Sequence, residues 1–103
     1  MGGFGTWDLI SRFPDKFAAA VPICGGGDEN MASKMVDIPI WAFHGDRDRV
    51  VKTIRSRNMI KALEAIEGKA KYTEYKDTGH LCWSKAFAET ELLNWLFSQS
   101  LKN

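Results

Sequence analysis

Three polar side chains follow two separate segments of the sequence that have the character of strands. Asp46 and Asp48 come directly after the apolar run at residues 38–43, and His80 follows the alternating segment at residues 69–75. If these segments are neighbouring parallel strands, their side chains leave the sheet at the same edge, roughly 5 Å apart. A carboxylate can then orient an imidazole that acts as a general base. Such a pair is two thirds of a nucleophilic triad.

The nucleophile that such a pair would serve is not evident in the sequence. None of the serines lies in a sharp glycine-flanked turn from a predicted strand into a predicted helix, which is one setting that activates a serine. Ser84 is nearest in sequence to His80, but no glycine flanks it. The serines compared are Ser11, Ser33, Ser56, Ser84, Ser98 and Ser100.

Composition and charge exclude several classes of function. The chain has 103 residues, which is one domain at most, with 14 basic and 13 acidic residues interspersed and a net charge of +1. Neither a nucleic-acid partner nor a membrane partner is indicated, and no apolar run is long enough to span a bilayer. No targeting signal can be read, so we expect a soluble protein of undetermined compartment.

Cofactor and metal motifs are also missing from the pattern. The glycines at residues 25–27 lack the Lys-Ser/Thr pair of a phosphate loop and the GxGxxG spacing, so no cofactor is expected. Cys24 and Cys82 lie far apart without a metal-binding spacing, and we expect two unpaired thiols and no metal. His44 ends a buried run before a glycine, which favours a structural role.

The elements that must position these residues alternate between helix and strand. Proline cannot donate a hydrogen bond to a ladder, so Pro22 weakens one of the predicted strands. The alternation indicates an α/β fold: a small parallel sheet of about three strands, with helices on both faces, in one domain at residues 1–103. We predict helices over residues 4–13, 50–66 (capped by Gly68) and 87–97, a turn or short helix over 30–36, and strands over 17–24, 38–43 and 69–75.

The segment HGDRDRVV at residues 44–51, followed some thirty residues later by DTGH, resembles the second half of the α/β-hydrolase family. The similarity is closest to carboxylesterase, phospholipase-like and polyester-depolymerase-like members. It implies a serine carboxylic ester hydrolase in which Asp48 is the triad acid, His80 is the general base and Trp83 stands beside that histidine. Asp46 then becomes a loop carboxylate that accepts hydrogen bonds from local backbone N–H groups.

The opening Met1-Gly2-Gly3 resembles the residues after the nucleophile in the GxSMGG turn of this family. The resemblance implies that the serine would stand immediately before Met1 and that the backbone N–H of Met1 would donate to the oxyanion. This leaves two hypotheses. Either the chain supplies acid and base to a nucleophile on another segment, acting on a small ester, or it is a non-catalytic domain that binds or assembles.

The second hypothesis depends on an exposed strand edge. The predicted strand between Phe17 and Cys24 has no neighbour on one side, and exposed apolar edges recruit partners. We therefore expect a homo-oligomer through this edge. On either hypothesis the isolated chain should hydrolyse esters negligibly. The four tryptophans fit packing roles better than a binding surface, with Trp83 the exception because it lies close to His80.

Overall fold

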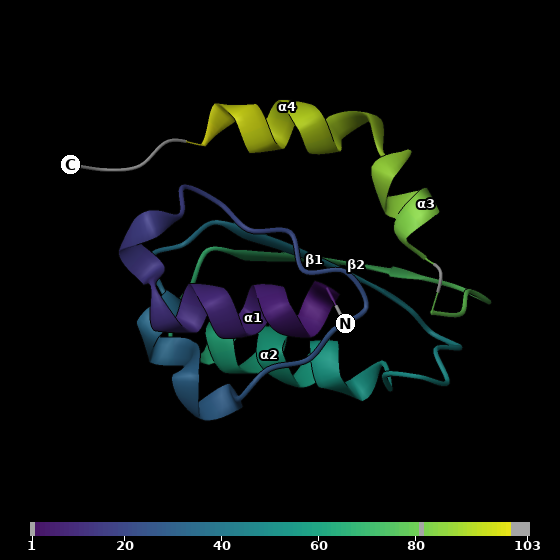
Figure 1. Cartoon of the computed structure of the whole chain (residues 1–103), viewed down its shortest axis with the longest axis horizontal. Helices are drawn as coiled ribbons and strands as arrows, with labels where there is room; N and C mark the ends of the chain where they lie inside the picture. The colour runs from purple at the N-terminus through teal and green to yellow at the C-terminus, as the bar shows by residue number, and fades with distance from the viewer. Residues whose placement is uncertain (1, 81, 100–103) are drawn as a thin grey trace.

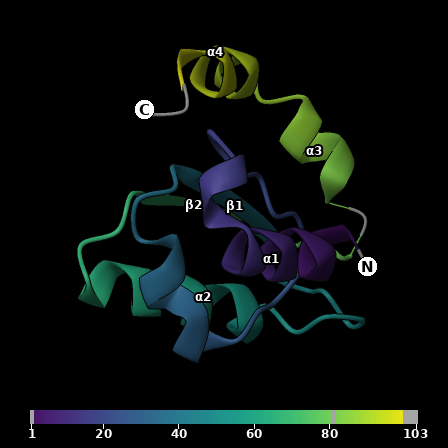
Figure 2. The same ribbon diagram turned by 60° about the vertical axis from the view of Figure 1, so that its left-hand side comes forward.

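The computed structural model describes residues 2–80 and 82–99. Its elements form three layers, with the sheet in the middle, α1 and α2 on one face and α4 on the other (Figures 1 and 2). This confirms the predicted α/β class with helices on both faces. The elements are α1 (Gly2–Arg12), η1 (Pro14–Lys16), η2 (Glu29–Met35), β1 (Ile40–Gly45), α2 (Ile54–Ala65), β2 (Ala70–Tyr75), α3 (Trp83–Phe87) and α4 (Thr90–Ser98). Within the described residues, no helix combines the length and the apolar character needed to cross a bilayer.

The sheet consists of β1 and β2 in parallel, with His44 opposite Glu74 and Gly45 opposite Tyr75. The predicted strand at residues 17–24 lies on the other side of β1, but it pairs only through isolated bridges from Ala20 and Ile23. Pro22 explains the interruption. Its carbonyl accepts the N–H of Phe43 at 2.9 Å, but it has no N–H to donate in return.

Strand β1 is buried on both faces, and its side chains alternate between two apolar clusters. Ile40 and Ala42 belong to the cluster that contains side chains of α1, η2 and α2. Trp41 and Phe43 belong to the cluster on the opposite face, with residues of α3 and α4. Strand β1 is apolar on both faces because a helical layer covers each of them. The polar candidate site residues follow at its carboxyl end.

Two glycines allow the start of α1 to lie directly against the chain that follows residue 23. A Cβ atom on Gly3 would clash with the Ile23 carbonyl and the Gly25 backbone, and one on Gly25 would clash with Gly3. By contrast, a Cβ on Gly2 or Gly5 would have nothing within 4 Å. The glycine-rich opening thus serves one close approach of two backbones, at Gly3.

Several predicted boundaries need correction. Strand β1 begins at Ile40 rather than at residue 38, and α2 begins at Ile54 because residues 46–53 form the turn after β1. The predicted helix over 87–97 corresponds to α4, which begins only at Thr90, and a separate short helix, α3, ends at Phe87. At the end of α2, Glu67 (φ 58°) adopts the left-handed conformation rather than Gly68, whose N–H donates to the Leu63 carbonyl at 2.8 Å.

The expectation of two unpaired thiols is wrong, because Cys24 and Cys82 form a disulfide bond. Their separation of 58 residues gave no sequence signal. The fold brings them together because Cys24 ends the bridged segment beside β1, while Cys82 follows the turn after β2. Both cysteines therefore lie at the end of the sheet where β1 and β2 have their carboxyl ends.

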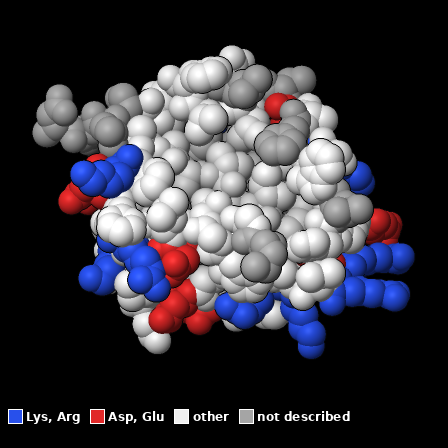
Figure 3. Space-filling view, in the orientation of Figure 1, with Lys and Arg blue, Asp and Glu red and all other residues white. Residues whose placement is uncertain are grey.

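The edge of the sheet formed by residues 18–24 lies toward the viewer in Figure 1, in front of β1 and β2. In the same orientation, charged side chains gather along the margins and leave the centre of this face uncharged (Figure 3). Among the described residues, no backbone hydrogen bond uses the N–H groups of Val21 and Ile23. The open edge is thus also the least charged part of this view.

Candidate active site

Asp48 is fixed by the turn that follows β1. Its Oδ1 accepts the backbone N–H groups of Val50 and Val51, each at 2.8 Å. Its Oδ2 accepts Nδ1–H of His80 at 2.7 Å and lies 3.1 Å from Nε2 of His44. The Asp48 side chain is fully buried, and these four donors compensate its lost hydration.

The same contacts decide the charge state of the carboxyl group. Burial raises the pKa of Asp48, but the hydrogen bonds from His80, Val51 and Val50 outweigh it, and the pKa lies below the ordinary value of 3.8. Asp48 is therefore an anion at neutral pH and can stabilise a positive imidazolium beside it.

His80 is positioned by the turn after β2, which lies against the end of β1. The carbonyl of Thr78 accepts the N–H of Arg47 at 2.8 Å. A Cβ atom on Gly45 would clash with the carbonyls of Thr78 and Gly79, so the glycine of the HGDRD motif gives the histidine turn its room. The two motifs of the sequence thus meet through backbone contacts as well as through their side chains.

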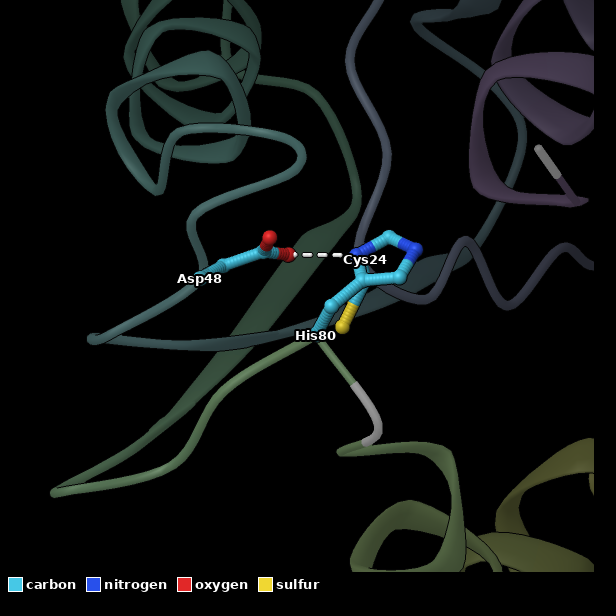
Figure 4. Close-up of side chains that lie close together, drawn as sticks. All are labelled: Cys24, Asp48 and His80. Atoms are coloured by element: carbon cyan, nitrogen blue, oxygen red, sulfur yellow. Dashed lines mark hydrogen bonds and ion pairs between the residues drawn. The ribbon is translucent and has the colours of Figure 1, made fainter.

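The imidazole of His80 has one nitrogen engaged and the other directed away from Asp48 (Figure 4). Because Nδ1 donates to the carboxylate, Nε2 is the nitrogen available to accept a proton. The His80 side chain is 26% exposed and borders a cavity of about 370 Å³. Gly2, Gly3 and Trp83 also line this cavity, so the histidine opens toward the first residues of α1.

His44 contributes to this site as a support for Asp48. Its ring is fully buried, and Nε2 lies 2.8 Å from the Val51 carbonyl as well as 3.1 Å from Asp48. Facing two acceptors, Nε2 carries the ring proton, and Nδ1 lies 2.7 Å from Oγ of Ser56. The sequence indicated a structural histidine but not its contact with Asp48. The spacing of four residues in HGDRD does not show this contact, because it leaves the directions of the two side chains open.

The other predicted site residues have different surroundings. Trp83, at the start of α3, is 51% exposed and lines the cavity with His80. Asp46 is exposed, and its backbone N–H donates to the Tyr75 carbonyl at 3.0 Å. Met1, predicted at the oxyanion position, lies outside the described residues.

Ligand atoms of Cys24, Asp48 and His80 lie within 4.8 Å of one another, which is the spacing of a possible metal site. The Cys24 sulfur is bonded to Cys82, however, and is not the thiolate that metals bind. Nδ1 of His80 is occupied by Asp48. In the disulfide form, this group is organised for a hydrogen-bonded acid–base pair rather than for a metal ion.

Comparison with known proteins agrees with this arrangement. The model of the dienelactone hydrolase family matches residues 1–92. The chain belongs to the dienelactone hydrolase family. Among solved structures, a thermostable esterase is 45% identical with a TM-score of 0.93, over 96% of this chain and 28% of its own. This family member therefore matches a little over a quarter of that esterase.

More distant structures share the fold alone. Esterase PE8 is 21% identical (TM-score 0.65, 78% of this chain and 39% of its own), and Arabidopsis thaliana SOBER1 is 19% identical (TM-score 0.74, 93% of this chain and 48% of its own).

An uncharacterized secreted protein of Arthroderma benhamiae is 30% identical over 109 residues, covering 77% of this chain and 12% of its own length.

These comparisons confirm the predicted resemblance to an esterase-like part of an α/β-hydrolase and support a hydrolase type of function. The closer similarity to phospholipases and polyester depolymerases stays a prediction. The described structure spans less than half of each solved esterase.

Proposed function

We propose that this member of the dienelactone hydrolase family is part of a serine carboxylic ester hydrolase. In this function, Asp48 orients His80 and stabilises its positive form, and His80 is the general base. The observation that supports it is the contact of 2.7 Å between His80 Nδ1 and Asp48 Oδ2, with the ring open to the cavity at the start of α1.

The nucleophile of the proposed enzyme is a serine directly before Met1. Helix α1 leads into the segment at residues 18–24, which runs parallel to β1. A strand preceding α1 would, by a right-handed crossover, pair with the open edge of that segment. The turn from such a strand into α1 would place its last residue beside Gly2 and Gly3, which line the His80 cavity. The N–H of Met1 would then donate to the oxyanion.

The proposed reaction is an acyl transfer in two steps. His80 Nε2 accepts the serine proton while the serine oxygen attacks the carbonyl carbon of a small ester. His80 then gives the proton to the alcohol oxygen as the ester C–O bond breaks, and the acyl group stays bonded to the serine oxygen. Water then attacks the acyl group with His80 again as base, releasing the carboxylic acid and the free serine. Asp48 keeps its charge throughout.

A chimera tests this proposal. Residues 1–103 would replace the matching segment of the thermostable esterase, which is 45% identical, so that the rest of that esterase supplies the missing parts. We expect the chimera to hydrolyse p-nitrophenyl acetate. Asp48→Asn should lower kcat by about 10⁴-fold and His80→Ala by about 10⁶-fold, the usual effects of losing the orienting carboxylate and the base of a triad.

Asp46→Asn is the matched control, because it removes an exposed carboxylate two residues from Asp48. Its kcat should stay within about twofold of the parent chimera, since surface substitutions cause small changes. A folded chimera without hydrolysis, or one in which His80→Ala remains active, would contradict the proposal. The isolated chain, tested beside it, should show only the background rate.

A second candidate function is supported by the open edge of residues 18–24. Backbone N–H groups of Val21 and Ile23 have no backbone partner among the described residues, and free strand edges are templates for pairing. As a domain acting alone, the chain would use this edge to assemble with a second copy. The two functions compete for one edge, because a strand that precedes α1 would cover it.

A further inference from the structure

The disulfide bond between Cys24 and Cys82 lies directly beside the acid–base pair. The sulfur of Cys24 is within 4.8 Å of a ring nitrogen of His80 and of a carboxylate oxygen of Asp48. Figure 4 shows this sulfur next to the His80 side chain. Cys82 lies only two residues after His80 in the sequence. A covalent bond is therefore placed where it can limit the movement of the base.

One end of the bond is anchored in the sheet. The N–H of Cys24 donates to the Phe43 carbonyl at 2.8 Å, and the residue is 3% exposed. The following residue, Gly25, packs against Gly3 at the start of α1. Cys24 also has a positive φ of 54°, which turns the chain sharply at this point. Its position is thus determined by the sheet, independently of the histidine turn.

The other end leads into α3. The carbonyl of Cys82 accepts the N–H groups of Lys85 and Ala86, both at 3.0 Å, in the first turn of that helix. The upstream side of the histidine turn is attached separately, since the carbonyl of Thr78 accepts the N–H of Arg47 at 2.8 Å. On the downstream side, the disulfide is the covalent attachment of the turn to the sheet.

We propose that the Cys24–Cys82 disulfide is a positioning element that keeps His80 against Asp48, and that a dithiol reductant releases the histidine. The role of His80 as base rests on the function proposed above. The position of the disulfide beside the His80–Asp48 contact does not depend on that function. Reduction breaks the bond between the two sulfurs. The two sulfur atoms take up two electrons and two protons and become two cysteine thiols. The dithiol supplies both and becomes a cyclic disulfide.

The test is NMR of the 103-residue chain with and without dithiothreitol. In the oxidised chain, we expect His80 to carry its proton on Nδ1, protected from solvent exchange by Asp48. After reduction, that proton should exchange at least tenfold faster. The pKa of Asp48, read from its carboxyl carbon, should rise because the hydrogen bond from His80 no longer offsets burial.

The variant Cys24→Ala/Cys82→Ala separates loss of the bond from other effects of the reductant. It should give the spectrum of the reduced chain and should not respond to dithiothreitol. Amide protons of β1 provide the control for folding, and their protection should be the same in every sample. Reduction should therefore act on the histidine turn and leave the sheet intact.

Three results would overturn the proposal. The first is the detection of two titratable thiols in the air-oxidised chain, and the second is identical His80 signals before and after reduction. The third is that reduction removes the exchange protection of the β1 amide protons together with the His80–Asp48 contact. The last would make the disulfide a stabiliser of the whole fold. None of these depends on hydrolysis, whereas an inactive chimera with an intact His80–Asp48 contact would contradict only the proposed esterase function.

Discussion

At the scale of single residues, Asp48 links the proposed catalysis to the stability of the fold. Its buried carboxylate receives two backbone N–H groups and faces two histidines, so the folded chain favours the charged form. A group whose pKa is lower in the folded than in the unfolded chain stabilises the fold above its unfolded pKa. That contribution is lost as the pH falls through the folded pKa.

The pH dependence of unfolding tests this link. At pH 7, Asp48→Asn should lower the free energy of unfolding by about 1.5–3 kcal/mol, because a hydrogen-bonded buried charge is removed. As the pH falls below the ordinary carboxyl pKa of 3.8, we expect the difference in the free energy of unfolding between variant and parent to narrow, since the lowered pKa of Asp48 makes it take up its proton only below that pH in the folded parent. Urea unfolding followed by tryptophan fluorescence measures both curves.

Asp46→Asn is again the control, and its curve should run parallel to that of the parent chain. The carboxyl of Glu74, whose pKa is lowered mainly by the hydrogen bond from Arg57, titrates in all three proteins and gives them a common slope. A gap between Asp48→Asn and the parent that stays constant down to pH 2 would contradict the assigned pKa direction.

Sequence reasoning at this scale succeeded where the chain order determines the geometry. Asp48 and His80 each follow a strand, and parallel strands bring their ends together, so their proximity could be predicted. The Cys24–Cys82 bond could not, because one cysteine lies beyond an irregular bridged segment and the other beyond a turn. His44 was recognised as structural, but its contact with Asp48 depends on side-chain directions that sequence spacing leaves open.

At the scale of elements, the placement of α1 depends on a glycine in its first turn. Gly3 allows the helix to touch the backbone of Ile23 and Gly25, and this contact sets one wall of the His80 cavity. Gly5, two positions later in the same helix, is exposed and has free space around it. At Gly3 a side chain has no room, whereas at Gly5 glycine only adds the entropic cost that it has inside any helix.

We expect opposite results from the same substitution at these two positions. Gly3→Ala should destabilise the fold by about 1–3 kcal/mol, because the new methyl group meets backbone atoms that cannot move aside. Gly5→Ala should stabilise it by about 0.5–1 kcal/mol, since glycine is costly inside a helix. Thermal and urea unfolding of both variants give the comparison, and equal effects of the two changes would contradict the close approach at Gly3.

Element types followed from the hydrophobic pattern, but their limits depended on tertiary contacts. The pattern of residues 17–24 is that of a strand, yet Pro22 leaves only bridges at Ala20 and Ile23. The apolar spacing of residues 50–66 suggested a helix from residue 50. Instead, the N–H groups of Val50 and Val51 bind Asp48, so the helix starts only at Ile54.

At the scale of the whole molecule, the arrangement leaves one edge of the sheet open. Beyond residues 18–24, no further strand belongs to the described part of the chain, and the face in Figure 3 is uncharged around that edge. The related solved structures are two to four times as long as the part matched here, with shares of 28%, 39% and 48%. Additional chain and a second copy are therefore the two candidates to cover this edge.

Sedimentation distinguishes these occupants. We expect the isolated 103-residue chain to be a dimer at micromolar concentration. The N–H groups of Val21 and Ile23, which have no backbone partner within the described residues, gain hydrogen bonds when two edges meet. The chimera with the thermostable esterase should lose this association, since its own upstream strand would occupy the edge. A chain that sediments as a well-folded monomer would contradict pairing through residues 18–24. A chimera that still dimerises as tightly as the isolated chain would place the contact on another surface. Because a covered edge and a nucleophile next to His80 require the same upstream strand, a monomeric chimera should also be the active one.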